Sequence, residues 1–470
     1  MKFSELLNID NISDDFEVTG LCIDTRNIKE NDIFFALPGS LENGENYIEI
    51  ALQKGAKRVI CEKKIENKRI YCVKNIFETY MKCVDKFYSF PQESVKLIGV
   101  TGTNGKTSVS HIISDILNNL RLNTGIIGTL GAKWQGKVLE FGNTTPSYLD
   151  FIKILRDMVD DGVRIVVCEV SAHAISQNRL GDTIFDIGIF TNLTQDHLDY
   201  FHTMEEYQKT KEYFLEKQCK YCIVNSDSEV GLNFYLNNQQ KTLTYGIYNP
   251  SDAFGINFEN SKLGEKFVSC VLDEIYNVDS VLIGEFNRYN LLCSVLTCRI
   301  LGIKGKKLER AISKIRAIDG RFNVYKGEKT VIIDYAHTPD GMKNVLSTAK
   351  KMTSGNLVCV FGCGGDRDKS KRRIMGLIAE SYADLVVLTE DNTRSENLPD
   401  IINDIMQDMT NKPKIIYSRR EAIEYAINMA NSSDIVLILG KGGEKYIEKG
   451  GCKYPFSDEE EVKRVLLHKE

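Results

Sequence analysis

The sequence has no apolar run that approaches the length of a membrane-spanning helix, so we expect no membrane insertion. Its first residues, MKFSELLNID, lack the basic segment and apolar core of a secretory signal peptide. The formal net charge is −5, which gives no reason to expect attraction to nucleic acid. No internal repeat or low-complexity tract stands out. These absences predict a soluble protein of the cytoplasm without a nucleic-acid partner, and we expect it to be a monomer.

The cysteines lack a framework as well. Thirteen of them are scattered over 470 residues, a distribution typical of reduced thiols in a cytosol. Cys219 and Cys222 form the only C-x-x-C pair, and no second pair or histidine cluster accompanies it. We therefore expect both to be small apolar residues that enter a strand, rather than a zinc or redox site.

Length and composition predict several folded units. The chain is too long for one ordinary domain, and its 42% apolar and 27% charged residues allow large cores, so two to four domains are expected. A separate unit precedes about residue 90, and a new series of strands and helices begins at about residue 318. Residues 242–280 are poorly patterned, with short strand-like pieces. The remaining alternation of strands and helices indicates an α/β fold.

The strongest motif is KLIGVTGTNGKT, residues 96–107. An apolar strand leads into a glycine loop, and the loop opens a helix whose apolar residues recur on one face. The loop residues whose backbone N–H groups would wrap phosphates are Gly102, Thr103, Asn104 and Gly105. Lys106 would place a charge on the outer phosphates, and Thr107 would offer a hydroxyl to magnesium. Although Val100 replaces the first glycine of the strict pattern, the motif predicts a nucleoside triphosphate site.

Titratable residues follow two further predicted strands. The apolar run 164–170 ends in Glu169, and the strand 185–190 leads to His197 between two nearby aspartates. Ligands of parallel α/β sheets lie beyond the carboxyl ends of the strands, so these groups should meet Lys106 in one crevice. Packing alone does not explain several titratable residues at the ends of two successive strands. A histidine between aspartates indicates a residue that takes part in metal binding.

Polar loops also follow the strands predicted in the last third of the chain. These strands are 331–334, 357–361, 385–388 and 435–439. Glycines, acids and arginines dominate the segments after them, so this region should present a second set of ligand-binding loops at one sheet edge.

The motifs GTNGKT, EVSAHAISQNR, TNLTQDHLDY, GEFNRYN, DGRF, DYAHTPD, GCGGDRD, DNTR and GKGGE follow one another in an order that resembles the Mur ligases, and most closely the MurE type. The resemblance covers nearly the whole chain. It implies an α/β fold of three domains: residues 1–92 would bind the uridine nucleotide, residues 93–317 would form the central ATPase on a parallel P-loop sheet, and residues 318–470 would form a Rossmann-like acceptor domain.

The resemblance implies ATP-dependent amide formation in peptidoglycan precursor synthesis. The side-chain carboxylate of D-glutamate in UDP-N-acetylmuramoyl-L-alanyl-D-glutamate would be phosphorylated to an acyl phosphate. The amine of meso-diaminopimelate would then attack and displace phosphate. ATP and Mg²⁺ would be the cofactors. The residues of the glycine loop before the helix at Lys106 suit phosphoryl transfer, because they can position the phosphates and neutralise their charge.

The resemblance also implies a role for individual residues. The catalytic and magnesium neighbourhood would comprise Lys106, Thr107, Glu169, His197 and Lys211, the last as a carbamate. The uridine nucleotide would contact Thr25 and Arg26. The muramoyl dipeptide would contact Thr144, Thr145, Ser171, Gln177 and Arg179. The adenosine side would include Asn287, Arg321, Asp334 and His337. The acceptor amino acid would be recognised by Arg367, Asp391, Asn392, Arg394, Gly440 and Glu444.

Two departures from the family pattern concern the acceptor. Thr393 replaces the proline of DNPR, which loosens a loop that proline would pre-set, and Gly443 replaces the histidine of GKGHE. Diaminopimelate remains favoured, because an arginine beside an acid suits a distal carboxylate and ammonium. The alternatives are another acceptor such as L-lysine, a different Mur or folylpolyglutamate-type ligase, and a nucleotide-binding regulator. The domain before the P-loop argues against the folate enzymes.

Overall fold

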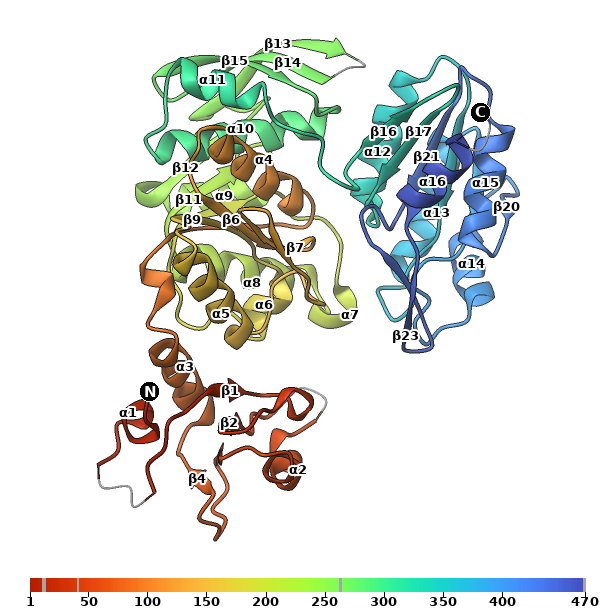
Figure 1. Ribbon diagram of the computed structural model, residues 1–470. Helices are drawn as coiled ribbons and strands as arrows, with labels where there is room; N and C mark the ends of the chain where they lie inside the picture. The colour runs from red at the N-terminus through yellow and green to blue at the C-terminus, as the bar shows by residue number, and fades with distance from the viewer. Residues whose placement is uncertain (11–13, 40–41, 262–263, 468–470) are drawn as a thin grey trace.

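The computed structural model describes residues 1–10, 14–39, 42–261 and 264–467. Figure 1 shows an α/β arrangement in which the C-terminal domain lies beside the central domain and the N-terminal domain lies beneath it. Each domain is built on its own sheet, and each sheet lies within one of the three residue ranges expected from the sequence. The boundaries of those ranges stay predictions. No helix among the described residues is long and apolar enough to cross a membrane.

The N-terminal domain has a parallel sheet ordered β1-β2-β3-β4. Its strands are β1 (Gly20–Cys22), β2 (Asp32–Phe35), β3 (Arg58–Cys61) and β4 (Ile70–Cys72). Its helices are α1 (Phe3–Leu7), α2 (Ile48–Gln53) and α3 (Ile76–Phe87). Helix α3 joins this domain to the central one, because the hydroxyl of Tyr80 accepts a hydrogen bond of 3.0 Å from the amide of Leu149.

The central sheet is ordered β15-β14-β13-β12-β11-β10-β5-β9-β6-β7-β8. Its strands are β5 (Lys96–Thr101), β6 (Thr124–Gly128), β7 (Gly131–Trp134), β8 (Lys137–Leu139), β9 (Ile165–Glu169), β10 (Phe185–Phe190), β11 (Cys219–Asn225), β12 (Thr242–Gly246), β13 (Ala253–Ser261), β14 (Gly264–Val271) and β15 (Glu274–Ser280). The helices are α4 (Lys106–Asn119), α5 (Tyr148–Asp160), α6 (Ala172–Ser176), α7 (Leu198–Phe201), α8 (Met204–Lys217), α9 (Glu229–Asn237), α10 (Glu285–Ile300) and α11 (Lys306–Ile312).

Strand β5 occupies the middle of this sheet, between β9 and β10, and pairs with both in parallel. Helices α4 and α10 cover one face, and α5 and α8 cover the other. Burial on both faces explains why these strands are continuous apolar runs rather than alternating ones. The carboxyl ends of β5, β9 and β10 therefore meet at one edge, as the sequence predicted.

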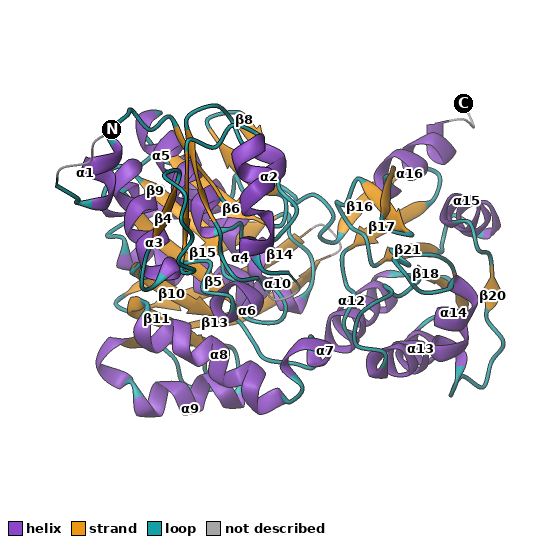
Figure 2. Cartoon of the chain, turned by 90° about the horizontal axis from the view of Figure 1, so that it is seen from below, coloured by secondary structure: helices purple, strands orange, loops and turns teal. Residues whose placement is uncertain are grey.

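The C-terminal sheet is ordered β16-β17-β21-β18-β19-β20 and is followed by a hairpin of β22 and β23. Its strands are β16 (Asn323–Lys326), β17 (Thr330–Asp334), β18 (Leu357–Phe361), β19 (Leu385–Leu388), β20 (Lys414–Ile415), β21 (Ile435–Leu439), β22 (Tyr446–Lys449) and β23 (Cys452–Pro455). Its helices are α12 (Pro339–Met352), α13 (Ser370–Tyr382), α14 (Leu398–Met406), α15 (Arg419–Met429) and α16 (Asp458–Leu467). Figure 2 shows α12, α13 and α14 on one face of this sheet and α15 and α16 on the other.

One expectation about strands needs correction. Residues 242–280 are not short pieces, because β13, β14 and β15 form a long antiparallel extension of the central sheet. A register shift between Ile256 and Glu259 interrupts the alternation of side chains there, which conceals the pattern in the sequence.

Cys219 and Cys222 are buried in β11. Their thiols lie 3.3 Å from the carbonyls of Phe214 and Leu215 in α8. Their position in a helix–strand contact confirms the expectation that they pack as small apolar residues.

A buried ion pair joins the elements that carry the C-terminal loops. Arg419 and Asp458 are both 0% exposed, and two hydrogen bonds of 2.7 Å connect them. The guanidinium of Arg419 also donates to the carbonyls of Leu439, at 2.9 Å, and of Glu390, at 3.3 Å. Because these carbonyls lie at the ends of β21 and β19, the pair fixes the points from which two polar loops leave the sheet.

Asp458→Ala should lower the free energy of unfolding by about 3–5 kcal/mol, because it leaves the Arg419 charge buried without its anion. Denaturant unfolding followed by circular dichroism would measure this loss. Lys463→Ala is the matched control on the same helix, since it removes an exposed pair with Glu459 and should cost about 0–1 kcal/mol. Equal losses for the two variants would contradict the role given to the buried pair.

Candidate active site

The polar loops of the central and C-terminal domains line one cavity of about 1450 Å³. The predicted site residues that line it are Thr103, Asn104, Gly105, Lys106, Thr107, Thr144, Glu169, Ser171, Arg179, His197, Arg321, Asp334, His337, Arg367, Asp391, Asn392, Arg394, Gly440 and Glu444. Single-ligand pockets are usually about 300–1000 Å³, so this volume has room for more than one ligand. The structure thus brings together most residues that the sequence singled out, although their roles stay predictions.

The loop between β5 and α4 is the one that the sequence predicts to hold phosphates. Gly102 and Gly105 have φ angles of 141° and 89°, which residues with a side chain rarely adopt. A Cβ at Gly102 would also collide with the hydroxyl of Thr191. Lys106 curls back over the loop, and its Nζ donates to the carbonyls of Gly102 and Thr103 at 2.9 Å. Burial lowers the pKa of Lys106, and the negative charge of Glu169 opposes that shift.

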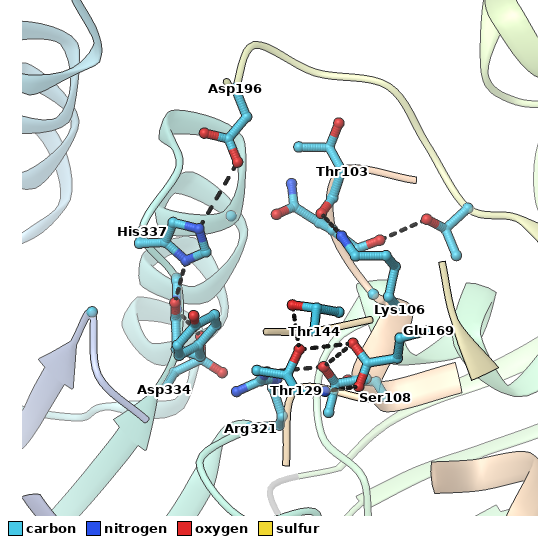
Figure 3. A pocket seen from close by; sticks show the side chains of 18 of the residues that line it. Thr103, Lys106, Ser108, Thr129, Thr144, Glu169, Asp196, Arg321, Asp334 and His337 are labelled. Carbon is cyan, nitrogen blue, oxygen red and sulfur yellow. Dashed lines mark hydrogen bonds and ion pairs between the residues drawn. The ribbon is translucent and has the colours of Figure 1, made fainter. Parts of the chain in front are cut away.

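Glu169 is the centre of a hydrogen-bond network at the start of α4. Its carboxylate is 0% exposed and accepts from the hydroxyl of Thr107 at 2.9 Å, and from the amide and hydroxyl of Thr129 at 2.9 and 3.0 Å. Arg321 of the C-terminal domain donates to the same Thr107 hydroxyl at 3.0 Å. Figure 3 shows this network facing Asp334 and His337 across the pocket. Carboxylate and hydroxyl oxygens side by side are the ligands that magnesium prefers.

Asp196 lies close to one lysine and two histidines, which come from both domains. His197 Nε2 lies 3.3 Å from its carboxylate, Lys371 Nζ lies 3.2 Å away and His337 Nε2 lies 3.9 Å away. Burial alone would raise the pKa of Asp196, but these neighbours outweigh it and hold the pKa below its usual range. Burial lowers the pKa of His197 to about 3, so its imidazole is neutral at physiological pH.

Lys211 lies behind the phosphate loop rather than in the cavity wall. Lys211 is only 1% exposed, and its Nζ donates to the carbonyl of Gly102 at 3.0 Å. The same carbonyl accepts from Lys106, so two lysine nitrogens converge on one oxygen. Burial lowers the pKa of Lys211 well below its usual value, and the charge of Lys106 lowers it further.

Other predicted residues also lie outside the cavity lining. Thr145 is fully buried and donates to the carbonyl of Glu169 at 2.8 Å. Gln177 accepts from Arg179, which does line the cavity, at 2.6 Å. Thr25 and Arg26 form a 3₁₀ turn in the N-terminal domain, where Arg26 pairs with Asp24 at 2.6 Å.

Asn287 also lies outside the cavity lining, beside a residue that belongs to it. The N-cap of α10 is Gly284, and Asn287 is buried in the first helical turn, where its Nδ2 donates to the carbonyl of Ile283 at 2.9 Å. Its Oδ1 accepts from Asn290 at 2.9 Å, and Asn290 is the residue of this pair that lines the cavity. Both asparagines are buried, and the start of the helix at Glu285 decides which of the two side chains faces the cavity.

The expected acceptor loops converge around a buried lysine. Lys441 is 0% exposed, and its Nζ donates to Asn392 at 3.1 Å and to Glu444 at 2.9 Å. Asn392 in turn donates to Glu444 at 3.0 Å. Gly440 has a φ of 109°, and a Cβ there would lie 2.5 Å from the Asp391 carboxylate. A cationic centre thus holds an amide and two carboxylates at one end of the cavity.

Sequence reasoning missed Lys371 and Thr129. Lys371 belongs to the basic run 369–373, a pattern typical of a solvent-exposed helix face. Its spacing of four residues from Met375, which lies four residues before Ala379 on the buried face of α13, could have indicated that Lys371 is buried. Thr129 carries no comparable signal, because only the pairing of β6 with β9 places it beside Glu169.

Gly102→Ala should deform the phosphate loop, because alanine meets both an unfavourable φ and the Thr191 hydroxyl. We expect nucleoside triphosphate affinity to fall at least about tenfold, as measured with a fluorescent ATP analogue. Gly142→Ala is the matched control in the same cavity, since nothing lies within 4 Å of its Cβ position. Unchanged affinity in Gly102→Ala would show that this loop does not hold phosphates.

Comparison with known proteins agrees with this arrangement. Residues 100–298 match the Mur ligase middle domain, and residues 320–442 match the Mur ligase glutamate ligase domain. The UDP-N-acetylmuramoyl-L-alanyl-D-glutamate--2,6-diaminopimelate ligase of Aquifex aeolicus (strain VF5) is 40% identical over 96% of this chain and 94% of that protein. The ligase of the same name from Clostridium tetani (strain Massachusetts / E88) is 38% identical over 99% of each chain. A solved structure of a ligase with this name superposes with a TM-score of 0.69 at 29% identity, over 100% of this chain and 99% of that one. The chain belongs to the Mur ligase family.

Proposed function

We propose that this protein is an ATP-dependent ligase that joins meso-diaminopimelate to the D-glutamate side chain of UDP-N-acetylmuramoyl-L-alanyl-D-glutamate. The observation that carries the proposal is the single cavity, which has a phosphate loop on one side and arginine–acid loops on the other. The names of the full-length relatives support the same reaction. A product of this kind is a precursor of peptidoglycan.

The chemistry has two steps. A carboxylate oxygen of the glutamyl side chain attacks the γ-phosphorus of ATP, the bond to the β,γ-bridging oxygen breaks, and ADP leaves. The amine of the acceptor then attacks the acyl phosphate, loses a proton and displaces inorganic phosphate. Positioning and charge neutralisation dominate phosphoryl transfer, and Lys106 with the loop N–H groups would supply both. Phosphate oxygens would replace the loop carbonyls that Lys106 contacts.

The residues at the start of α4 fit a magnesium ion. The Thr107 hydroxyl and the Glu169 carboxylate lie 2.9 Å apart, and we propose that His197 and Lys211 complete its neighbourhood. No group of three or more His, Cys, Asp or Glu side chains suited to a metal occurs in the described part of the chain. This suits magnesium, which keeps several waters and uses one or two carboxylates together with phosphate oxygens. When bound, the ion would neutralise charge on the transferred phosphoryl group.

We propose that Lys211 is carbamylated. Two ammonium groups converging on the Gly102 carbonyl repel each other, which disfavours charge on the more buried lysine. Its neutral amine would attack carbon dioxide, forming an N–C bond and releasing a proton. The resulting carbamate is an anion beside Lys106, so the modification would turn a repulsive pair into an attractive one. It would also provide the carboxylate-like ligand that the family pattern implies.

The acceptor would bind at the end of the cavity that the C-terminal domain forms. The distal centre of meso-diaminopimelate carries a carboxylate and an ammonium, which suit Arg394 and Arg367 on one hand and the acids Asp391 and Glu444 on the other. L-Lysine lacks the distal carboxylate and would offer these arginines no anionic ligand group. The uridine end of the other substrate would extend over the N-terminal domain toward Thr25 and Arg26.

The decisive measurement is phosphate release with ATP, magnesium and UDP-N-acetylmuramoyl-L-alanyl-D-glutamate. We expect stimulation by meso-diaminopimelate and little by L-lysine or L-ornithine, with Lys106→Ala as the inactive baseline. Stimulation by a different amino acid would retain the ligase reaction and overturn the acceptor assignment. If none stimulates release, the proposed reaction is wrong.

Lys211→Met should lower turnover about a hundredfold or more, because it removes a charge-stabilising group beside the phosphates. The fold should survive, since methionine replaces a buried cation with an apolar side chain of similar length. Lys209→Met is the matched control on the same helix, where Lys209 is exposed and pairs with Glu205. In carbon-dioxide-free buffer, wild-type turnover should fall and recover with bicarbonate. Full activity of Lys211→Met would refute the proposed role.

A further inference from the structure

We propose that Arg372 and Glu396 form a buried clasp that positions Arg394 for the acceptor amino acid. The clasp consists of these two side chains, and the inference rests on the ligase reaction proposed above. Neither residue lines the cavity, so neither touches a ligand, and both are positioning residues that act through Arg394.

Arg372 is built into the first turn of α13 as a structural cation. Arg372 is 1% exposed, and its two terminal nitrogens each donate to one oxygen of the Glu396 carboxylate at 2.9 Å. The same nitrogens donate to Asp404 at 2.9 Å and to the carbonyl of Gly364 at 3.0 Å. Such a fork-to-fork pair fixes direction as well as distance. Arg372 therefore attaches the loop after β18 to the loop after β19.

Further hydrogen bonds join the loop after β18 directly to the loop after β19. Glu396 accepts from the amide of Asp366 at 2.6 Å, and Asp366 accepts from the hydroxyl of Ser395 at 2.6 Å. The amide of Gly365 donates to the carbonyl of Asn392 at 2.8 Å. Asp366 and Arg394 have φ angles of 52° and 51°, which non-glycine residues adopt only when their surroundings enforce it. The clasp provides that enforcement.

This geometry determines where the guanidinium of Arg394 lies. Its Nη1 donates to the carbonyl of Gly365 at 2.7 Å, and its Nε lies 3.3 Å from the carboxylate of Glu448. Its Nη2 makes no hydrogen bond to any described residue, and Arg394 lines the cavity. One edge of the guanidinium is thus held by the loops, and the remaining nitrogen is available for an anionic ligand.

The clasp explains how the loop keeps its shape with Thr393 in place of proline. Proline would restrict the backbone at one residue, whereas the clasp ties one end of the loop, at Glu396, to helix α13 and to the loop after β18. Arg372 lowers the pKa of Glu396 to about 2, with help from the Asp366 amide and Lys369, so the carboxylate stays ionised at physiological pH.

Glu396→Gln tests the inference, since it keeps the size of the side chain and removes its charge. We expect the KM for meso-diaminopimelate to rise roughly tenfold, while the KM values for ATP and the UDP-dipeptide change less than about twofold. Arg373→Gln is the matched control at the next helical position, where Arg373 forms an exposed pair with Asp408. It should leave all three KM values unchanged.

A double-mutant cycle with Arg394→Gln identifies the route of the effect. If the clasp acts through Arg394, adding Glu396→Gln to Arg394→Gln should raise the acceptor KM no further. Additive effects, or parallel increases in all three KM values with a lower melting temperature, would show a merely structural role and overturn the inference. An unchanged acceptor KM in Glu396→Gln would also overturn it, while the proposed reaction would stand. Absence of wild-type turnover with meso-diaminopimelate would refute the reaction and the clasp together.

Discussion

The arrangement of the site depends on the buried carboxylate of Glu169. It lies at the end of β9, accepts from the first turn of α4 through Thr107, and fixes the turn after β6 through Thr129. A carboxylate withdrawn from water is stable only when its oxygens are fully hydrogen-bonded, so each of these segments must be in place. Arg321 extends the network to the C-terminal domain through the same threonine hydroxyl. One acid therefore sets the geometry of the phosphate loop and of the facing domain.

Polar side chains make several of the contacts between the two larger domains at the site. Asn104 of the phosphate loop donates to Asp340 at 3.1 Å, Gln195 donates to Asp368 at 3.1 Å, and Lys371 pairs with Asp196. Polar contacts of this kind are stable in contact with water, whereas Ile283 and Phe286 of the central domain pack in an apolar contact with Phe322 of the C-terminal domain. Such an interface suits a site that must admit three substrates and then exclude water during phosphoryl transfer. Four of these residues also line the cavity, so domain contact and ligand contact are linked: Asn104, Asp196, Asp340 and Lys371.

Buried cations support the loops of the C-terminal domain. Arg419 fixes the ends of β19 and β21, Arg372 ties the loops after β18 and β19, and Lys441 gathers Asn392 and Glu444. A buried charge is costly unless its partners are in place, so each cation penalises displacement of the loop that it holds. Glycine-rich loops with little apolar packing gain rigidity in this way. That rigidity is what recognition of a small zwitterionic amino acid requires.

The sequence by itself determined the glycine loop before α4, most strand positions and the convergence of Lys106, Glu169 and His197. These features follow from local chemistry: glycine conformations, helical periodicity and the rule that parallel strands end at one edge. Tertiary structure alone decided which polar residues turn inward. Lys371 and Arg372 lie in a basic run that reads as solvated, Lys211 lies behind the phosphate loop, and the turn of β6 brings Thr129 to Glu169. The physical reason is that burial of a charge depends on partners far away in the chain, and such partners leave no periodic trace in the sequence.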